Sequence, residues 1–290
     1  MRTRYLVAGL TLCLTALTTT ATAAAVAEET DYTVHTATNT KTTAQLDAYW
    51  TPERIRDATP IEAPAVAAST IQQQPGQPIS VPGSAPATRG LNETTGRLLF
   101  SANGGDYICT ATVVASNNKS VLATARHCGF NDGGTNYRYA PNYSGGNTPH
   151  GWWDWKSAGW VSGGDGITDD VAFIVLNQKD GRPVADVVGA NGIAFNQPIE
   201  QYAYLVGIPG DKDVVFRCEA QAYAGPQSQQ LMDNCNGMSG GASGGSWNVN
   251  PQPDGWAYQT GTYFGSYGSA AAGSRFGDVA YDVWNGAQNG

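Results

Sequence analysis

The chain has 290 residues, which is enough for a well-packed core in one large domain or two moderate ones. It carries 16 Lys and Arg against 24 Asp and Glu, a formal net charge of −8, with no basic stripe. We therefore expect no nucleic-acid partner, because such proteins present clustered positive charge to the phosphates.

The first residues have the order of a secretory signal peptide. Arg2 and Arg4 precede an apolar run that ends at Leu17, and small residues then lead to Ala27. A retained membrane anchor is the alternative, but it needs about 20 apolar residues and this run is shorter. We expect residues 1–27 to be removed on export. The mature protein is then expected to be secreted, extracellular, monomeric and free of any membrane.

Residues 28–89 are rich in Thr, Ala and Pro and have little apolar periodicity. Thr51-Pro52-Glu53 predicts the start of a short helix through Arg56, with a threonine cap and a proline in its first turn. Prolines recur from Pro60 to Pro86, which is typical of a linker. We interpret residues 28–89 as a pro-segment and Pro-rich linker; the alternative is an extension that stays attached.

The character of the chain changes at Leu98, where runs of β-branched and aromatic residues begin to alternate with turn residues. No long stretch has a convincing helical period, so residues 90–290 are predicted to form an all-β domain of sandwich or barrel type. The predicted strands lie in LLFSA (98–102), YICTATVVAS (107–116), SVLATARHC (120–128), DDVAFIVL (169–176), QYAYLVGIP (201–209), DVVFRCEAQAYA (213–224), AYQTGTYFG (257–265) and FGDVAYDVW (276–284).

Four cysteines remain after the signal: Cys109, Cys128, Cys218 and Cys235. An even number in an exported chain indicates two disulfides, with three pairings formally open. A metal site is the competing interpretation, but no C-x-x-C pair occurs and the later histidines lie far from the last two cysteines. We expect neither a metal nor another cofactor.

Two overlapping G-x-S-G-G frames, centred on Ser239 and Ser243, raise the possibility of a serine nucleophile. Such a serine needs a base and a carboxylate that orients the base. The candidate bases beyond the pro-segment, His127 and His150, both precede the serines. This excludes the Ser-Asp-His order of α/β-hydrolases. A subtilisin order would need an aspartate before the histidine, where only a weakly placed Asp106 stands, so the order left is His, Asp, Ser.

His127 ends an apolar run and stands beside Cys128, and a bridge from Cys128 to Cys109 would hold its loop in place. His150 lies in a Gly-, Pro- and Asn-rich loop and is interpreted as a surface histidine. Asp170 opens a continuous apolar run, so it is predicted at the edge of the core, where it can accept a hydrogen bond from His127 Nδ1.

These motifs resemble those of the chymotrypsin/trypsin-like serine proteases, particularly the secreted bacterial members. TARHC, DDVAF and GASGGSW resemble T-A-x-H-C, D-[IV]-A-L and G-[DSA]-S-G-G-P, and the resemblance covers residues 98–285. It implies two packed antiparallel β-barrels with the active site in the cleft between them. It further implies His127, Asp170 and Ser243 as the catalytic triad of an endopeptidase that acts on polypeptides.

Ser239 is the alternative nucleophile, because DNCNGMSGG resembles the trypsin form D-S-C-Q-G-D-S-G-G, with Asp233 six residues before the serine. In that form the cysteine pairs with a later one, and no cysteine follows Cys235. The resemblance therefore implies that Cys235 pairs with Cys218, and that Cys109 pairs with Cys128. Because the residues after Ser243 can enter a strand, we expect Ser243 to be the nucleophile.

The resemblance also assigns the amides of Gly241 and Ser243 to an oxyanion hole, and Ser266-Tyr267-Gly268 to substrate binding. Ala242 replaces the aspartate that pairs with the new N-terminus in trypsin-like zymogens, so that activation switch is expected to be absent. Six residues before Ser243 stands Gly237, not a carboxylate. We therefore expect no strong preference for cleavage after Arg or Lys.

The tryptophans of HGWWDWKSAGW (150–160) allow a sugar-binding interpretation, but we expect Trp153, Trp155 and Trp160 to be buried between hairpins. The function predicted from the sequence is a secreted serine endopeptidase. The rival from another class is a catalytically silent binding protein on the same fold.

Overall fold

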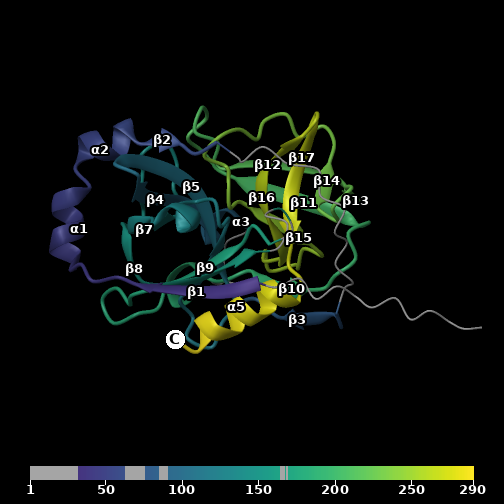
Figure 1. Ribbon diagram of the computed structural model, residues 1–290, viewed down its shortest axis with the longest axis horizontal. Coiled ribbons are helices and arrows are strands. Elements are labelled where there is room, and N and C mark those ends of the chain that lie inside the picture. Colours follow the sequence, from purple (N-terminus) through teal and green to yellow (C-terminus); the bar gives the residue numbers. More distant parts are fainter. Residues whose placement is uncertain (1–31, 63–75, 85–90, 164–166, 168) are drawn as a thin grey trace, which may run out of the picture. The chain divides into compact units, whose positions relative to one another are not determined.

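The computed structural model describes residues 32–62, 76–84, 91–163, 167 and 169–290 (Figure 1). The predicted signal peptide lies outside the described residues. The helices are α1 (Thr43–Tyr49), α2 (Pro52–Asp57), α3 (Leu91–Thr94), α4 (Ala185–Val188) and α5 (Asp278–Gln288), with a 3₁₀ turn at Phe130–Asp132. Within the described part of the chain, no helix has the length and apolar character needed to cross a membrane.

The first sheet closes into a barrel. Its strands run in the order β1-β8-β7-β4-β5-β6-β9. β8 also pairs with β9, which closes the six strands from β8 to β9 into the barrel and leaves β1 as an added strand beside β8. The short β2 pairs with β5 in parallel, while the other pairs are antiparallel. The strands are β1 (Tyr32–Thr38), β2 (Thr59–Pro60), β4 (Thr95–Ala102), β5 (Gly105–Val114), β6 (Val121–Thr124), β7 (Thr135–Pro141), β8 (Trp153–Gly163) and β9 (Ala172–Leu176).

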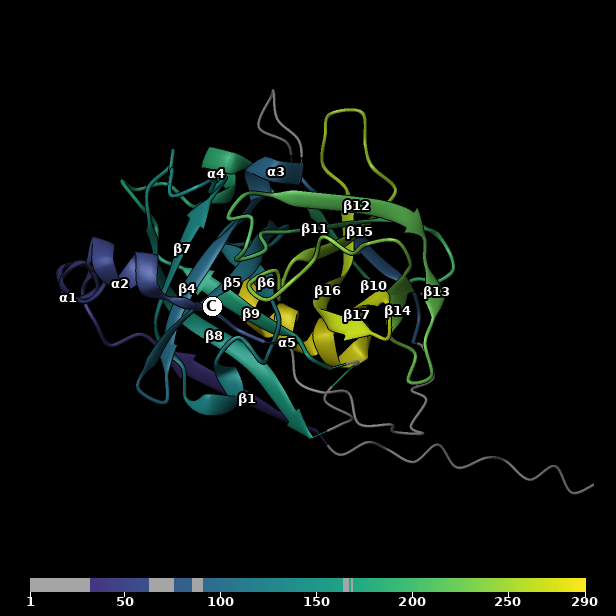
Figure 2. The ribbon, with the colours of Figure 1, turned by 90° about the horizontal axis from the view of Figure 1, so that it is seen from above.

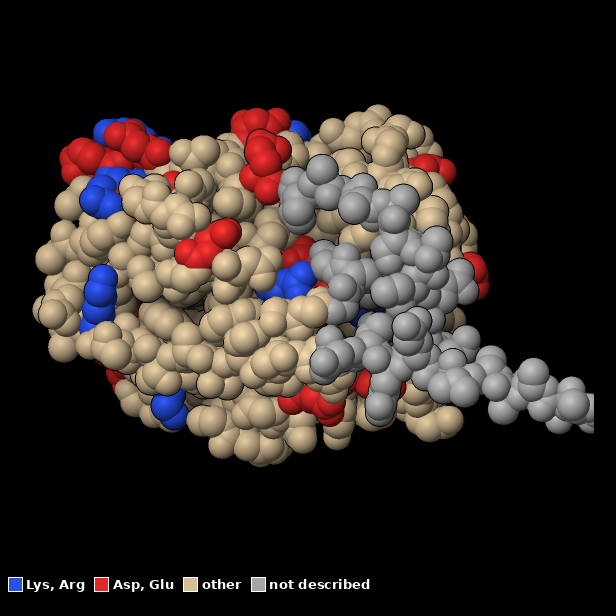
Figure 3. All heavy atoms as spheres, viewed as in Figure 1, with Lys and Arg blue, Asp and Glu red and all other residues tan. Residues whose placement is uncertain are grey.

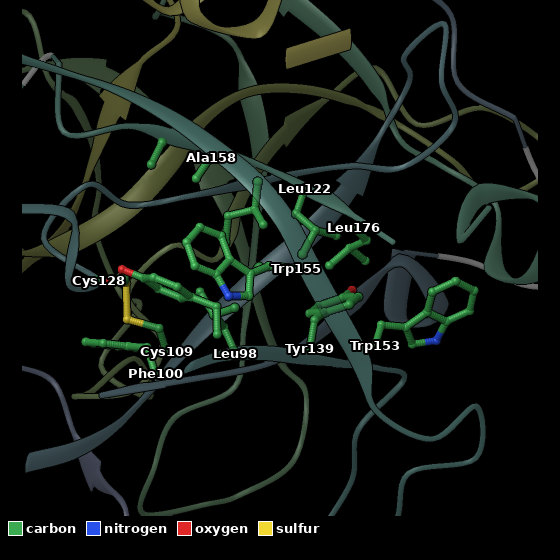
Figure 4. Close-up of a cluster of buried hydrophobic side chains, with 14 of the residues drawn as sticks. Leu98, Phe100, Cys109, Leu122, Cys128, Tyr139, Trp153, Trp155, Ala158 and Leu176 are labelled. Carbon is green, nitrogen blue, oxygen red and sulfur yellow. Dashed lines mark hydrogen bonds between the residues drawn. A yellow bond between two sulfur atoms is a disulfide. The ribbon is translucent and has the colours of Figure 1, made fainter. Parts of the chain in front are cut away.

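Large apolar and aromatic side chains fill this barrel (Figure 4). Trp153 and Trp155 are 2% and 4% exposed, which confirms that they are buried, and Trp160 is half-buried against the same cluster. The Cys109–Cys128 disulfide lies in this cluster and joins β5 to the turn after β6. The first predicted pairing is therefore confirmed.

The second sheet curls into a half-barrel. Its order is β12-β11-β15-β16-β17-β14-β13, with β10 and β3 attached beside β16, and no pairing among the described residues joins its two ends. The Cys218–Cys235 disulfide, also as predicted, crosses this gap from β12 to the segment after β14. The strands are β3 (Ile79–Val81), β10 (Gly192–Phe195), β11 (Tyr202–Gly207), β12 (Phe216–Gln221), β13 (Tyr223–Ala224), β14 (Gln230–Met232), β15 (Ser246–Val249), β16 (Tyr258–Tyr267) and β17 (Ala270–Arg275).

This arrangement confirms the predicted two-barrel, all-β fold, with one error at the C-terminus. The run FGDVAYDVW was predicted as a strand, but its residues from Asp278 onward form α5 (Figure 2). Val279, Ala280, Val283 and Trp284 recur with a helical spacing and are all buried. They pack against β9 and β10 in a cluster shared by the two sheets, so the helix covers the junction between them.

The described part of residues 28–89 has regular structure, namely β1, α1, α2, β2 and β3. The helix predicted at Thr51-Pro52-Glu53 is α2, and the Thr51 side chain accepts a hydrogen bond from Arg54 N. The proline-rich part was predicted as a linker, yet it contains β3, which pairs with β10. Prolines are tolerated there because Pro78 and Pro82 flank a short edge strand and take no place within it.

Candidate active site

The register of β6 against β9 brings His127 and Asp170 together. Thr124 pairs with Ala172, so the turn after β6 faces the turn before β9. His127 Nδ1 lies 2.6 Å from Asp170 Oδ2, and the His127 amide donates to Asp170 Oδ1 at 2.9 Å. Both side chains are buried. Two hydrogen bonds to one carboxylate fix the orientation of the imidazole, as the predicted pair requires.

A second charged pair braces the same two turns. Arg126 Nη1 lies 3.2 Å from Asp169 Oδ2 and 2.8 Å from the carbonyl oxygen of Val161 on β8. Both side chains are less than a tenth exposed. Neither Arg126 nor Asp169 was predicted from the sequence to take part in the site. The sequence feature that could have predicted this pair is that two residues of opposite charge, Arg126 and Asp169, adjoin runs that are otherwise apolar.

Glycines shape the loop that carries Ser243. Gly241 has φ +86° and Gly244 has φ +81°, a region in which other residues are strained. A Cβ atom on Gly244 would lie 2.2 Å from Thr124 Oγ1 and 2.3 Å from the carbonyl oxygen of Thr110. Only glycine therefore lets the loop approach the turn after β6, which carries His127.

Thr110 on β5 ties this loop to the first barrel. Its amide donates to the carbonyl oxygen of Ser243 at 2.8 Å, and its hydroxyl donates to the carbonyl oxygen of Gly241 at 3.0 Å. The same hydroxyl accepts from Ile208 N. The carbonyl oxygen of Ser243 also lies 3.7 Å from Cys128 Sγ, in the residue after His127. These contacts place Ser243 beside the histidine turn. Among the described residues, His127 Nε2 has no hydrogen-bond partner.

Ser239 has a different environment. Its hydroxyl donates to Asp211 Oδ1 at 2.5 Å, near the surface. This bond lowers the pKa of Asp211, and the ammonium of Lys212 lowers it further. Asp233, which the Ser239 frame would use for specificity, is exposed and accepts from the Tyr223 hydroxyl. The described contacts give Ser239 an acidic partner and no histidine.

The amides of Gly241 and Ser243, the predicted oxyanion donors, differ in their hydrogen bonding. Gly241 N donates to the carbonyl oxygen of Ile61 at 3.3 Å, while Ser243 N donates to no described residue.

At Gly237, the position that would carry a trypsin-like carboxylate, an added Cβ would lie 2.1 Å from the Phe216 ring.

The predicted substrate-binding segment Ser266-Tyr267-Gly268 lies at the far end of β16, where Tyr267 pairs with Ala270 at the hairpin turn. The residues of β16 that contact the site come earlier. Thr262 Oγ1 donates to the carbonyl oxygen of Asp170, and Tyr263 exchanges backbone hydrogen bonds with Gly244 and Gly245. Neither Thr262 nor Tyr263 was predicted from the sequence, and a substrate-binding role for residues 266–268 stays a prediction.

Two further observations concern metals and histidines. His150 Nε2 lies 3.5 Å from Glu93 Oε2, so His150 stands outside the His127–Asp170 pair. Among the described residues, no group of three or more His, Cys, Asp or Glu side chains could hold a metal ion.

A two-barrel fold with a buried His-Asp pair beside a glycine-rich serine loop is typical of one class of serine proteases. The chain belongs to the chymotrypsin/trypsin-like serine protease family. It is similar to the thermostable serine protease AL20 from an extremophilic microorganism, with 32% identity and a TM-score of 0.60 over 68% of this chain and 98% of that one. It is also similar to the protease Anisep from Arthrobacter nicotinovorans, with 28% identity and a TM-score of 0.62 over 72% and 100% of the two chains. No family model and no curated protein sequence matches the chain.

Proposed function

We propose that the protein is a secreted serine endopeptidase that uses Ser243, His127 and Asp170. The observation that carries the proposal is the buried His127–Asp170 pair, in which Nδ1 is held at 2.6 Å and Nε2 is left without a described partner. An imidazole held in this way has its second nitrogen available as a base.

The proposed reaction follows from these positions. Ser243 Oγ attacks the carbonyl carbon of the scissile peptide while His127 Nε2 takes the hydroxyl proton. Asp170 stabilises the imidazolium that forms. The imidazolium then gives its proton to the leaving amine, so an acyl-enzyme remains, and water, activated by the same base, hydrolyses it. The amides of Gly241 and Ser243 stabilise the oxyanion, and the loss of one such donor costs about 3 kcal/mol in the transition state.

A fluorophosphonate probe, which labels only an activated serine, tests the proposal. We expect it to label the purified protein at Ser243 after removal of residues 1–89, and we expect Ser243→Ala to abolish labelling. Ser239→Ala is the matched control, because it removes a hydroxyl four residues away in the same repeated frame. Labelling that survives Ser243→Ala but not Ser239→Ala would move the nucleophile. A folded, processed protein that is never labelled would favour a silent binding protein.

The specificity proposal is that Arg and Lys are not preferred at the cleaved position. Gly237 packs against Phe216, and Asp233 is engaged at the surface, so neither supplies a buried carboxylate. A buried carboxylate is what makes a cationic side chain strongly favoured, because little else offsets its desolvation. Profiling on a mixed peptide library should give cleavage after neutral or acidic residues. Cleavage mainly after Arg or Lys would contradict the proposal.

Secretion and processing form part of the same proposal. The two disulfides, Cys109–Cys128 and Cys218–Cys235, fit an oxidising compartment. We expect the exported protein to begin after Ala27 and the active form to have lost residues 28–89. N-terminal sequencing of the secreted and the active protein would test both boundaries.

A further inference from the structure

The residues from Tyr32 to Glu62, here called the N-terminal segment, lie along the first barrel (Figure 1). β1 pairs with β8 over its full length, from Tyr32 opposite Gly163 to Thr38 opposite Ser157. β1 is therefore an added strand of the first sheet, and the segment has a defined binding surface.

Two apolar side chains anchor the helical part of the segment. Leu46 on α1 is fully buried, and Trp50 is 4% exposed. Trp50 packs with Leu99 and Ile108 of the barrel, and its Nε1 donates to the carbonyl oxygen of Asn136 at 2.7 Å. Burial of a large aromatic side chain with its polar atom satisfied is typical of a specific binding site.

Charged contacts surround these anchors. Arg138 binds Asp47 of α1 at 2.7 Å, and Asp106 binds Arg54 of α2 at 2.7 Å. Tyr49 also donates to Asp106 at 2.7 Å. Figure 3 shows acidic and basic side chains mixed over α1 and α2. These charge pairs fix the register of the bound segment.

The end of the segment enters the candidate active site. β2 pairs with β5 in parallel, and Ile61 N donates to the carbonyl oxygen of Ile108 at 3.2 Å. The carbonyl oxygen of Ile61 then accepts from Gly241 N at 3.3 Å, so it occupies a proposed oxyanion donor. The segment holds this donor with a carbonyl group of its own.

Residues on either side of Ile61 also lie close to two loop glycines. A Cβ on Gly210 would lie 2.4 Å from Pro60 Cγ, and a Cβ on Gly240 would lie 2.9 Å from Glu62 Oε1. The segment therefore runs from β5 of the first barrel to the loop that carries Ser243.

The Ile61 carbonyl group that accepts from Gly241 N is not arranged for reaction. Only Gly241 N binds it, and Ser243 N donates to no described residue. An oxyanion needs its donors placed together where the charge develops. We propose that the N-terminal segment is a built-in inhibitor, and that its docking surface on the first barrel still binds the segment as a separate chain once the connection to the protease domain is cut. This inference rests on the proposed protease function.

The test uses the full chain with the recognition sequence of a specific protease inserted between residues 62 and 76, labelled with the fluorophosphonate before and after cutting. The uncut chain should be labelled at Ser243 at least about tenfold more slowly than the cut chain after dilution. At high concentration the cut chain should again be labelled slowly, because the free segment rebinds by mass action.

Variants locate the docking surface. Trp50→Ala should speed labelling of the uncut chain towards the rate of the cut, diluted chain. Val34→Ala should leave the slow rate unchanged, because Val34 lies in the same segment with its side chain 48% exposed. If Trp50→Ala fails to fold, the dilution series on the cut wild-type chain still decides the question.

Each other outcome has one meaning. Equal labelling of uncut and cut chains at every concentration would refute the inhibitor while the protease function stands. Spontaneous cleavage after Ile61, seen by mass spectrometry, would also refute it, because the segment would then be a substrate. If no form is labelled, the proposed protease function itself fails, and the inhibitor role fails with it.

Discussion

Replacement of Gly244 by alanine is the sharpest test of how the loop around Ser243 is built. The φ angle of +81° is in the left-handed region, where a residue with a Cβ costs about 1–2 kcal/mol more than glycine. The added Cβ would also lie 2.2 Å from Thr124 Oγ1 and 2.3 Å from the carbonyl oxygen of Thr110. Overpacking of this kind costs about 1–3 kcal/mol. Together these give a loss of about 2–5 kcal/mol.

Gly268→Ala is the matched control. Gly268 also has a positive φ, +60°, but a Cβ there would meet no atom within 4 Å. It should therefore cost only the left-handed term, about 1–2 kcal/mol. The free energy of unfolding, measured by urea denaturation of both variants, separates the backbone term from the steric one.

The two variants should also differ in their reaction with the fluorophosphonate probe. Gly244→Ala should slow fluorophosphonate labelling of the processed protein, because the loop must move away from β5 and the histidine turn, while Gly268→Ala should leave labelling unchanged. Equal destabilisation by the two variants would refute the claim that the close approach, and not the φ angle alone, demands glycine at 244. Reduced peptide hydrolysis by a folded Gly268→Ala variant that is still labelled at the wild-type rate would support the predicted substrate-binding role of residues 266–268.

Two further predictions concern neighbouring charges. Arg126→Met should destabilise the protein by about 3–5 kcal/mol in urea denaturation, because Asp169 loses its buried cationic partner, whereas Arg217→Met, at an exposed pair, should change stability by about 1 kcal/mol or less; similar losses would contradict the assignment. Ser239→Ala should raise the pKa of Asp211, measured by NMR titration, because the hydroxyl is the main group that lowers it. A carboxyl group whose pKa is lowered in the folded protein stabilises the fold when the pH is above the pKa of the same group in the unfolded chain. The stability difference between wild type and Ser239→Ala should therefore vanish as the pH falls through the folded pKa. An unchanged pKa in the variant would contradict the Ser239–Asp211 hydrogen bond.

Several strands of both barrels were predictable because they depend on local pattern, whereas β7, β10 and β17 were not predicted. The two disulfide pairings were implied by the resemblance to a known family and not by the local pattern. The run at 169–176 forms β9 and the run at 201–209 forms β11, each within a few residues of the predicted bounds. The order His, Asp, Ser and the resemblance to the family motifs associated His127 with Asp170. The structure brings the two together because Thr124 of β6 pairs with Ala172 of β9. FGDVAYDVW also carries a helical pattern, because Val279, Val283 and Trp284 recur with helical spacing. It was predicted as a strand because it is rich in β-branched and aromatic residues.

The sequence could not predict where isolated apolar or charged residues lie in the folded protein. Residues 28–89 have few apolar side chains, so their composition indicates a linker. The few that exist are used as anchors: Leu46 and Trp50 are buried against the barrel, and β1 gains its hydrogen bonds from β8. Nothing in the local pattern distinguishes an anchor from an isolated apolar residue. The Arg126–Asp169 pair was missed for the same reason, because the partners are 43 residues apart.

One strand edge links the fold, the site and the segment. β6 pairs with β5 only from Thr112 onward, so the preceding part of that edge of β5 is left for other partners. Residues two apart in a strand direct their backbone polar groups to the same edge. The carbonyl oxygen of Ile108 accepts from Ile61 N, and the Thr110 amide donates to the carbonyl oxygen of Ser243. Between them, Cys109 bridges to the histidine turn. Because three consecutive residues hold the segment, the histidine turn and the serine loop, displacement of the segment exposes a strand edge already joined to both halves of the candidate site.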